Sequence, residues 1–486
     1  MNDINNVIAA ISDFLQNYIL LILLCGTGIY FTIRLKFVQI RKFGAGLKAT
    51  FGNIKLKGDK AGKDGMSSFQ ALTTAIAAQV GTGNLAGAAT AMVSGGPGAI
   101  FWMWVSAFFG MATIYAEATL AQKYKTVDKD GHVTGGPVYY IRAAFRGKFG
   151  KVLAAIFSVF LILALGFMGN MVQSNSIGSA FQTAFHIKPW IVGIIVAAIA
   201  GFIFLGGVGR IASFTEKIVP IMALFYIVGS VAIICMNYRN IGNAFYSIFV
   251  GAFNPAAVGG GVLGVTVQKA VRYGVARGLF SNEAGMGSTP HAHATAKVKD
   301  PCDQGIVAMM GVFIDTFIVL TLTALVILTS VNVDGSVTGT ELTQSAFAGT
   351  FGNVGIIFVA ICMLFFAFST IISWYFFGEI NVSYLFGKKA VKIYAALVIA
   401  FIVVGSFLKV DTVWALADFF NSLMVIPNLL GVLALSGVVV TASKLYDAKK
   451  KADKLPKQAI VPNPELSCEN DTASFEAELS KPEIVE

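Results

Sequence analysis

Long apolar runs alternate with short polar loops along most of the chain, from about residue 10 to residue 442. About 20 consecutive apolar residues are enough for a helix to cross the hydrocarbon core of a bilayer. The pattern predicts eleven such helices. No basic residues precede the first one, so it is not expected to be a cleavable signal peptide. The expected ranges are 14–36, 68–94, 97–124, 152–180, 189–207, 216–237, 266–299, 305–331, 352–384, 390–408 and 411–442.

Two of these predicted helices contain residues that form helices poorly. The stretch "AAQVGTGNLAG" places Gly81 and Gly83 close together, and "GLFSNEAGMGSTP" combines Glu283 with glycines and a proline. A charge at the centre of a bilayer is costly. Irregular backbone at that depth is tolerated only where protein buries it or where it lines a watery cavity. Both segments are therefore expected to be broken helices, near 81–84 and near 280–288.

Each broken helix begins a block of five helices, 67–237 and 266–442. Because five is odd, the second block is expected to cross the membrane in the opposite sense. Interrupted helices at corresponding positions of inverted halves are typical of secondary transporters that bind their substrate near the midplane. The remaining expected parts are an N-terminal helix with a basic cytoplasmic loop (1–66), an extracellular connection (238–265) and a disordered cytoplasmic tail (443–486).

Composition agrees with an all-α integral membrane protein. Of the 486 residues, 56% are hydrophobic and 13% are charged, whereas soluble domains carry about 25% charged residues. The net charge of +10 is interpreted as membrane topology, with no nucleic-acid partner, because lysine and arginine concentrate in alternate loops. This bias predicts a multi-pass protein of the plasma (inner) membrane, with the N-terminus extracellular or periplasmic and the C-terminus cytoplasmic. The five cysteines are scattered without metal-binding spacing.

The first break predicts a site for two opposite charges. Its first half is expected to end at Gln79–Val80 with carbonyls in the gap, and its second half to begin after Asn84, a residue that can cap a helix. The amides of Thr82 and Gly83 would then face an anionic group. An amino-acid zwitterion beside a sodium ion fits this pattern. Close helix packing is the alternative reading of the glycines, while their GxGxxxG spacing without a preceding strand disfavours a dinucleotide site.

Four longer stretches resemble the alanine/glycine:cation symporter (sodium:alanine symporter) family: "SSFQALTTAIAAQVGTGNLAGAATAMVSGGPGAIFWMW", "GFMGNMVQSNS", "RYGVARGLFSNEAGMGS" and "FSTIISWYFFGE". The resemblance covers about residues 15 to 440. It implies the leucine-transporter (LeuT-like) fold, a 5+5 inverted repeat preceded by one extra helix. It also implies sodium-coupled uptake of small neutral amino acids, alanine and/or glycine, by alternating access. Sodium is the expected coupling ion, no other cofactor is expected, and a monomer surrounded by membrane lipid is expected.

The resemblance also implies sodium ligands. "AAQVGTGN" is similar to the first core helix of leucine transporters, and helix 352–384 is similar to the sodium-site helix of that fold. Serine and threonine in membrane helices often bond their own backbone instead, which is the alternative for the two hydroxyls. The expected sodium ligands are Ala77, Val80, Asn84, Ser369 and Thr370, with Gln79 beside Asn84 at a second sodium ion.

Substrate contacts are expected from three further elements. Asn170 belongs to a polar stripe with Gly166, Gln173 and Ser174, for which interhelical hydrogen bonding is the alternative. Trp374 lies one helical turn from Thr370 on the same face, and large apolar side chains near the second break would restrict the pocket unless they only pack. The expected substrate-binding residues are Gln79, Thr82, Gly83, Asn170, Phe280, Met286, Thr370 and Trp374.

Several polar residues remain open. Asp315 is expected to approach the second cation region, pair with Arg277 or relay a proton. Glu117 and Glu379 are expected to form ion pairs at an inner gate. His291 and His293 are expected to lie at the membrane interface. No nucleophile–base pair or ring of like charges supports an enzyme or a channel, and the alternative transporters are a proton-coupled one and one for a larger neutral amino acid such as glutamine.

Overall fold

The computed structural model describes residues 14–52, 65–128, 130–254, 266–408 and 410–453. These residues are mostly helical, and each strand among them has only two residues. The chain up to Ser443 forms one compact unit and the remainder a second. In the described residues, six helices are long and apolar enough to cross a membrane, in addition to shorter apolar helices at Tyr18–Arg34 and Pro189–Phe204. The six are Gly98–Lys123, Gly147–Phe185, Gly207–Met236, Pro301–Ser330, Asn353–Phe386 and Val413–Ala434.

The N-terminal region consists of one long helix and two short ones. A π-helical turn, η1 (Leu15–Leu20), leads into α2 (Leu21–Arg34), which packs against α7 (Gly98–Lys123). The short helices α3 (Val38–Arg41) and α4 (Phe43–Phe51) follow.

The first broken helix comprises β1 (Met66–Ser67), α5 (Ser68–Gln79), η2 (Gly83–Gly87) and α6 (Ala88–Gly95). It starts with a capping box: the Ser67 hydroxyl accepts from the Gln70 amide, and the Gln70 side chain accepts from the Ser67 amide. This reciprocal pair satisfies two amides that a helix start otherwise leaves without partners. The sequence therefore fixes where α5 begins, twelve residues before the break.

The rest of the first half is built from long helices joined by short elements. The hairpin β2–β3 is antiparallel, and α9, η3 and α10 run on as one helix from Gly147 to Phe185. The elements in chain order are β2 (Thr126–Val127), β3 (Val133–Thr134), α8 (Pro137–Ala144), α9 (Gly147–Leu161), η3 (Ile162–Gly169), α10 (Asn170–Phe185), α11 (Pro189–Phe204), α12 (Gly207–Met236), η4 (Tyr238–Asn240) and α13 (Ile241–Phe253).

The second broken helix comprises α14 (Val267–Asn282), α15 (Pro290–Ala294) and β4 (Ala296–Lys297). β4 pairs in parallel with β1, so that Met66 lies opposite Ala296. The elements that follow are α16 (Pro301–Val312), η6 (Phe313–Leu320), α17 (Thr321–Ser330), α18 (Gly339–Phe351), α19 (Asn353–Phe386), α20 (Lys388–Gly405), α21 (Val410–Ala434) and α22 (Ser436–Ala452).

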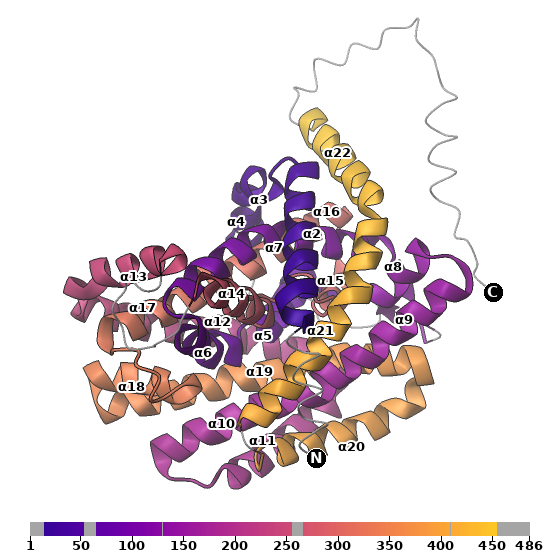
Figure 1. The fold of residues 1–486 in the computed structure, drawn as a ribbon. Helices are drawn as coiled ribbons and strands as arrows, with labels where there is room; N and C mark the ends of the chain where they lie inside the picture. The colour runs from indigo at the N-terminus through magenta and orange to yellow at the C-terminus, as the bar shows by residue number, and fades with distance from the viewer. Residues whose placement is uncertain (1–13, 53–64, 129, 255–265, 409, 454–486) are drawn as a thin grey trace, which may run out of the picture. The chain divides into compact units, whose positions relative to one another are not determined.

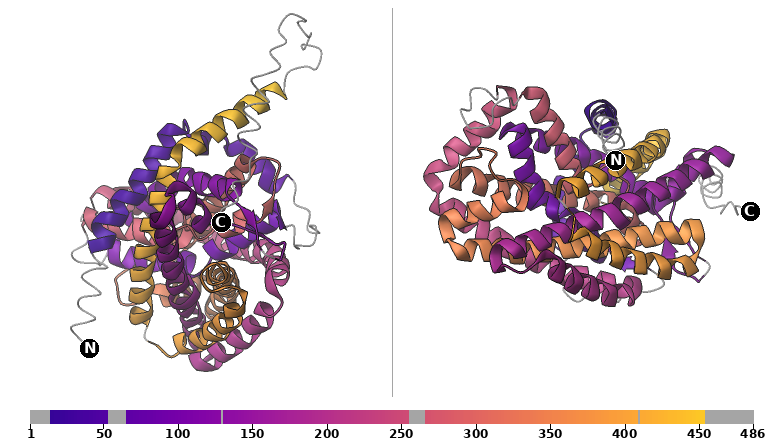
Figure 2. Two further views of the ribbon diagram at one scale, coloured as in Figure 1. Left: turned by 90° about the vertical axis from the view of Figure 1, so that its right-hand side faces the viewer. Right: turned by 60° about the horizontal axis from the view of Figure 1, so that its bottom comes forward.

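The two broken helices lie in the interior of the first unit. In Figure 1, α5, α14 and α15 lie near the middle of the ribbon. α7 packs against α14 and α16 on one side, and α19 packs against both α5 and α10. Figure 2 shows the long helices α10, α11 and α20 running beside one another, in agreement with their mutual contacts. Residues from both breaks are thus enclosed by helices from distant parts of the chain.

The structure corrects several expected boundaries. The helix expected over 216–237 begins already at Gly207, and the last expected helix is divided at Leu435 into α21 and α22. The connection 238–265 contains the helix α13, and α22 continues to Ala452, inside the segment expected to be a disordered tail. The short helices α3, α4, α8 and α18 were not predicted, because they lie in polar loops and are too short to give a membrane-length apolar run. Residues 454–486 of the tail lie outside the described residues.

Candidate functional site

The first break leaves the helix for only a few residues. α5 ends at Gln79, Val80 has the non-helical angles φ −83° and ψ 84°, and helix resumes at Gly83. A side-chain carbon on Gly81 would lie 2.4 Å from Oγ1 of Thr370, and one on Gly83 would lie 2.9 Å from Cα of Ser281. Glycine is thus needed here for close approach, because the break is pressed between α19 and α14.

The sequence suggested that Asn84 caps the second half of the broken helix, but the structure shows otherwise. The second half already begins at Gly83, so Asn84 lies inside it. Its Oδ1 instead accepts from the Gly81 amide at 3.1 Å, and its Nδ2 donates to Oδ1 of Asp315 at 2.7 Å. The side chain therefore reaches back across the break and out to a buried carboxylate.

Two hydroxyls of α19 meet a carbonyl at the end of α5. Oγ1 of Thr370 lies 2.9 Å from the Ala77 carbonyl oxygen, and Oγ of Ser369 lies 3.5 Å from it. Both hydroxyls also donate to Phe366 in their own helix, so the backbone bonding weighed as the alternative occurs as well. Val80, which caps α5, is fully buried close by. The expected sodium ligands Ala77, Ser369 and Thr370 are therefore in contact with one another.

The polar side chains that form a stripe along η3 and α10 are buried, and one of them contacts the first break. Oε1 of Gln173 accepts from the Thr82 amide at 3.2 Å. The Asn170 side chain donates to the Gly166 carbonyl of its own helix, and its Oδ1 is buried without a hydrogen-bond partner in the described chain. The same holds for Oε1 of Gln79, Oγ1 of Thr82 and Oγ of Ser174. Buried polar atoms normally have partners, so each of these unpaired atoms is available to a polar ligand or water.

The second break is longer and is held by a carboxylate. Glu283 has a left-handed backbone with φ 57°, and Gly285 and Gly287 also have positive φ. Oε2 of Glu117 in α7 accepts from the Gly285 amide at 2.9 Å, and its Oε1 accepts from the Gly287 amide at 3.0 Å and from Asn428 at 2.6 Å. Glu117 thus bonds the irregular backbone, and no ion pair joins it to any described residue. The expected role in an inner-gate ion pair is wrong for this residue.

The breaks contact each other, and large side chains enclose them. Nε2 of Gln79 donates to the Asn282 carbonyl at 2.8 Å. The Phe280 ring meets the Trp374 ring edge to face, with centroids 5.8 Å apart. Met286 and Trp374 are at most 1% exposed. Phe280 and Trp374 therefore lie together beside the second break.

Asp315 receives hydrogen bonds from both broken helices. Its side chain accepts from Asn84 of η2, from the Ser281 hydroxyl of α14 at 2.9 Å and from Thr316 at 2.8 Å. It is fully buried. The expected alternative of pairing with Arg277 is wrong, because Arg277 forms its ion pair with Asp418 at 2.9 Å. Asp315 therefore lies beside Asn84, one of the residues expected at a second sodium ion.

Comparison with known proteins decides the family. Residues 1–460 match the sodium:alanine symporter family. The chain belongs to this family. AgcS of Methanococcus maripaludis, a sodium/alanine symporter, is 43% identical over 458 residues, which cover 92% of this chain and 98% of AgcS. GlnT of Bacillus subtilis, a probable sodium/glutamine symporter, is 41% identical over 93% of either chain.

One solved structure supports the fold. The structure of MhsT in complex with L-phenylalanine is similar to 78% of this chain, over 97% of MhsT, with a TM-score of 0.53 and 13% sequence identity. At this identity the likeness concerns the fold alone. The family and this likeness confirm the predicted resemblance: the protein is a membrane transporter of the symporter class with a LeuT-like fold.

In this symporter, the two histidines are buried inside the protein. His291 and His293 are at most 1% exposed. A ring nitrogen of His291 bonds Asn381 of α19 at 2.8 Å, and one of His293 bonds Gln304 of α16 at 2.8 Å. No group of three or more metal-ligating side chains occurs in the part of the chain that is described. Both side chains thus point into the protein toward helices distant in sequence, and their expected place at the membrane interface stays a prediction.

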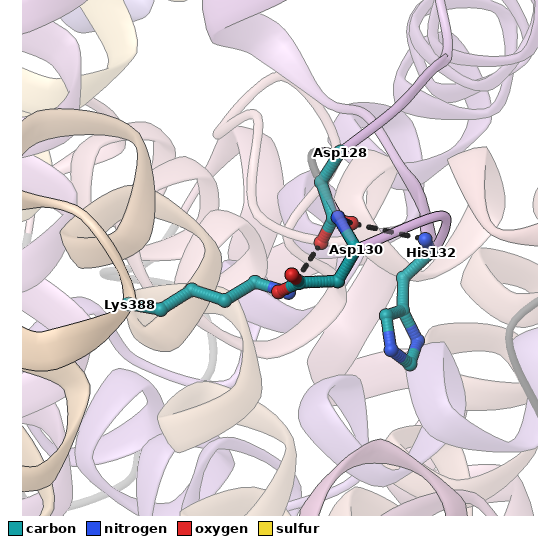
Figure 3. A network of polar contacts seen from close by, with 4 residues as sticks. All are labelled: Asp128, Asp130, His132 and Lys388. Atoms are coloured by element: carbon teal, nitrogen blue, oxygen red, sulfur yellow. Dashed lines mark hydrogen bonds and ion pairs between the residues drawn. The ribbon is translucent and has the colours of Figure 1, made fainter.

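A charged contact ties the β2–β3 hairpin to α20. Lys388 binds Asp130 and lies 2.9 Å from Asp128, whose Oδ1 accepts from the amides of Asp130 and His132 (Figure 3). Partial burial opposes ionisation, but the hydrogen bond from Lys388 and those of the amides outweigh it and lower the pKa of Asp128. Burial likewise opposes the charge of Lys388, but the two carboxylates raise its pKa. In acid, protonation of Asp128 thus removes one of the two carboxylates that bind Lys388.

Sequence reasoning gave no role to several residues that hold this site in the symporter. Glu283, Ser281 and Asn282 stood in the irregular stretch without separate functions, and Asn428 and Asp418 were not considered. Glu379, expected in an ion pair, has a buried Oε2 without a hydrogen-bond partner among the described residues. The available signal was the presence of carboxylates and amides in strongly apolar helices, where polar groups are costly.

Proposed function

We propose that this protein takes up small neutral amino acids, alanine and/or glycine, by symport with sodium through alternating access. The observation that carries the proposal is the contact of the Ala77 carbonyl with the hydroxyls of Ser369 and Thr370, at 3.5 and 2.9 Å. In this contact, oxygen atoms that suit a hard cation come together from a broken helix and from α19. Its relative AgcS is a sodium/alanine symporter.

For sodium, the proposed ligands are the carbonyls of Ala77 and Val80 and the hydroxyls of Ser369 and Thr370. Hard cations prefer oxygen ligands, and a hydroxyl that now donates to the Ala77 carbonyl can rotate to offer its oxygen beside that carbonyl. The second proposed cation region contains Asn84 with Gln79, where the Asp315 carboxylate supplies negative charge.

For the amino acid, we propose that the amides of Thr82 and Gly83 receive the carboxylate. Gln79 and Asn170 would add polar contacts, because each has a buried side-chain oxygen without a partner in the described chain. Thr370 would border both the sodium and the substrate. The apolar walls of the pocket are proposed to be Phe280, Met286 and Trp374.

The proposed architecture has eleven membrane-spanning helices. One N-terminal helix precedes two inverted five-helix repeats, 67–237 and 266–442. We further propose a multi-pass plasma (inner) membrane protein with its N-terminus outside and its C-terminus in the cytoplasm, on the basis of the distribution of lysine and arginine. In this orientation, α15 and the β1–β4 pair lie on the cytoplasmic side of the breaks.

Coupling requires that sodium and amino acid favour the same conformation, so that each raises the affinity of the other. A specific observation favours each alternative. Asp315 is fully buried and accepts hydrogen bonds from both broken helices, which supports a proton carrier in place of a second sodium ion. The relative GlnT is a probable sodium/glutamine symporter, which favours a larger neutral substrate.

The test is counterflow of labelled alanine in proteoliposomes, with sodium, lithium and the pH gradient varied separately. The proposal predicts saturable exchange that requires sodium and is competed by glycine. Exchange that follows the pH gradient without sodium would favour the proton alternative. Preferential competition by glutamine would favour the larger substrate.

A further inference from the structure

Glu283 combines three features that together demand an explanation. Among the described non-glycine residues with positive φ, which are Lys36, Phe37, His186 and Glu283, it alone is buried. A left-handed backbone at a residue other than glycine is strained, and such strain persists where the surrounding structure enforces it. Its carboxylate is completely buried and forms no ion pair with the described residues.

Two neutral donors bind this carboxylate. Oε1 accepts from the indole Nε1 of Trp374 at 2.6 Å, and Oε2 accepts from the Ser288 hydroxyl. Ser288 lies in the same irregular segment, so one oxygen is held within the break and the other is directed at α19. The left-handed turn at Glu283 is what ends α14 and begins this segment.

The indole of Trp374 is confined on its other sides. A side-chain carbon at Gly169 would lie 2.4 Å from Cζ3 of Trp374, so the ring packs directly on the backbone of η3. The Phe280 ring meets it edge to face. Packing therefore limits where the ring lies, and the hydrogen bond to Glu283 fixes its rotation, because the indole has a single N–H donor.

We propose that Glu283 is a positioning residue that sets the substrate selectivity of this symporter by holding the Trp374 indole as the wall of the pocket. This inference rests on the proposed function, in which Trp374 borders the amino-acid side chain. Without the hydrogen bond, the ring gains rotational freedom and the pocket admits larger side chains. Sodium ligands are not involved, so the sodium response should stay unchanged.

Three substitutions separate this role from others. Trp374→Phe removes the N–H and leaves the segment 283–289 untouched. Glu283→Gly removes the carboxylate and keeps the turn, since glycine adopts positive φ without strain. Glu283→Gln keeps an acceptor for Trp374 and can donate to Ser288, so it retains both contacts without the charge. Trp104→Phe is the matched control, because its indole donates to Thr321 at 2.8 Å away from the breaks.

The measurement is competition by glycine, alanine, valine and leucine against labelled alanine, together with KM, maximal rate and the sodium concentration for half-maximal uptake. We expect Trp374→Phe and Glu283→Gly each to reduce discrimination between alanine and leucine by about tenfold, mainly through KM. The double variant Trp374→Phe with Glu283→Gly should show little further loss of discrimination between alanine and leucine. Glu283→Gln and Trp104→Phe should keep the selectivity of the wild type.

The outcomes are distinct. Unchanged selectivity in both Trp374→Phe and Glu283→Gly overturns the proposal. Loss of uptake in Glu283→Gln, with Glu283→Gly equally inactive, also overturns it, because the charge itself would then be required. If the unmodified protein takes up no small neutral amino acid with sodium, the proposed function fails, and this inference fails with it.

Discussion

Gly83 shows how a single residue brings the two breaks together. Its backbone φ is not positive, so a side chain there would not strain the backbone conformation. A side-chain carbon at Gly83 would nevertheless lie 2.9 Å from the backbone of Ser281. Backbone of α14 would have to shift to make room. The proposed function gives the amides of Thr82 and Gly83 to the substrate carboxylate, which would have to replace Oε1 of Gln173 as the acceptor for the Thr82 amide.

We therefore expect Gly83→Val to abolish alanine binding while the protein still inserts and folds, because a β-branched side chain displaces the facing backbone. Binding of labelled alanine to purified, monodisperse protein is the measurement. Gly26→Val is the matched control, since a side-chain carbon at Gly26 in α2 would meet nothing within 4 Å. Wild-type affinity in folded Gly83→Val protein would remove the substrate from this break.

The two hydroxyls near Ala77 give a second prediction at this scale. The double substitution Ser369→Ala with Thr370→Ala should raise the sodium concentration for half-maximal uptake at least about tenfold, since each contact to a charged group is worth about 1.5–3 kcal/mol. Ser373→Ala is the control: it removes a buried hydroxyl one turn further along α19 that has no hydrogen-bond partner in the described chain. A changed alanine affinity with an unchanged sodium response would instead assign the hydroxyls to the substrate.

Residue types could be predicted from the sequence, but their partners could not. Glycines in an apolar run indicated the break, and likeness to a known fold indicated Ala77 with Thr370, which the structure brings to 2.9 Å. Asn84 was expected as a cap because asparagine favours that position. The nearby carboxylate of Asp315, 231 residues further along the chain, instead accepts a hydrogen bond from the side-chain amide of Asn84. Pattern reasoning along one segment contains no information on such a distant partner.

Among the elements, α14 and α21 are joined by an ion pair on the side of Phe280 away from α15. Arg277 lies 2.9 Å from Asp418, with side chains 10% and 18% exposed. The guanidinium also lies 4.5 Å from the Trp414 ring centroid, and Trp414 contacts Phe280 with centroids 4.7 Å apart. The ion pair thus lies next to the aromatic contacts of Phe280, a proposed pocket wall. It links two helices that the proposed orientation places toward the outside.

Removing one partner of this ion pair should lower the stability of the protein more than removing both partners. Arg277→Met and Asp418→Asn should each lower the thermal unfolding temperature, because a nearly buried charge is left without its partner. The double variant should recover part of the loss, with a coupling of about 1–3 kcal/mol. Arg239→Met, at an exposed site, should leave the temperature unchanged. Additive losses in the double variant would contradict a coupled pair.

Long apolar helices and their interruptions were predictable, because lipid imposes length and continuity on a membrane helix. The short helices were not. α8 begins with Pro137 and α18 follows Thr338, both in loops whose composition resembles other polar connections. Three π-helical segments, η2, η3 and η6, adjoin or contain Asn84, Asn170 and Asp315. Such widened turns are frequent at functional sites, but no apolar periodicity reveals them.

At the scale of the whole molecule, β1 and β4 join the ends of the two broken helices. Met66 pairs with Ala296, just before α5 and just after α15. Gln122 of α7 donates to the Ala294 and Ala296 carbonyls at 3.2 and 2.9 Å. The two half-helices are thus joined by backbone pairing, and α7 is joined to them by a side chain that bonds backbone carbonyls. The contact from α15 to α19, in contrast, is made by two side chains, His291 and Asn381. In alternating access, the side-chain contact is the one that we expect to open.

This difference predicts opposite results for two cross-links in a background without cysteines. Directly paired strand residues lie about 5 Å apart, within the reach of a disulfide. Met66→Cys with Ala296→Cys, once oxidised, should still exchange alanine, because β1 and β4 move as one body. His291→Cys with Asn381→Cys, bridged by a reducible thiol-specific reagent long enough to replace both side chains, should stop exchange and recover on reduction, because α15 and α19 must separate. Arrest by the first cross-link that reduction relieves would mean that the half-helices part during transport, and the opening would then lie between β1 and β4.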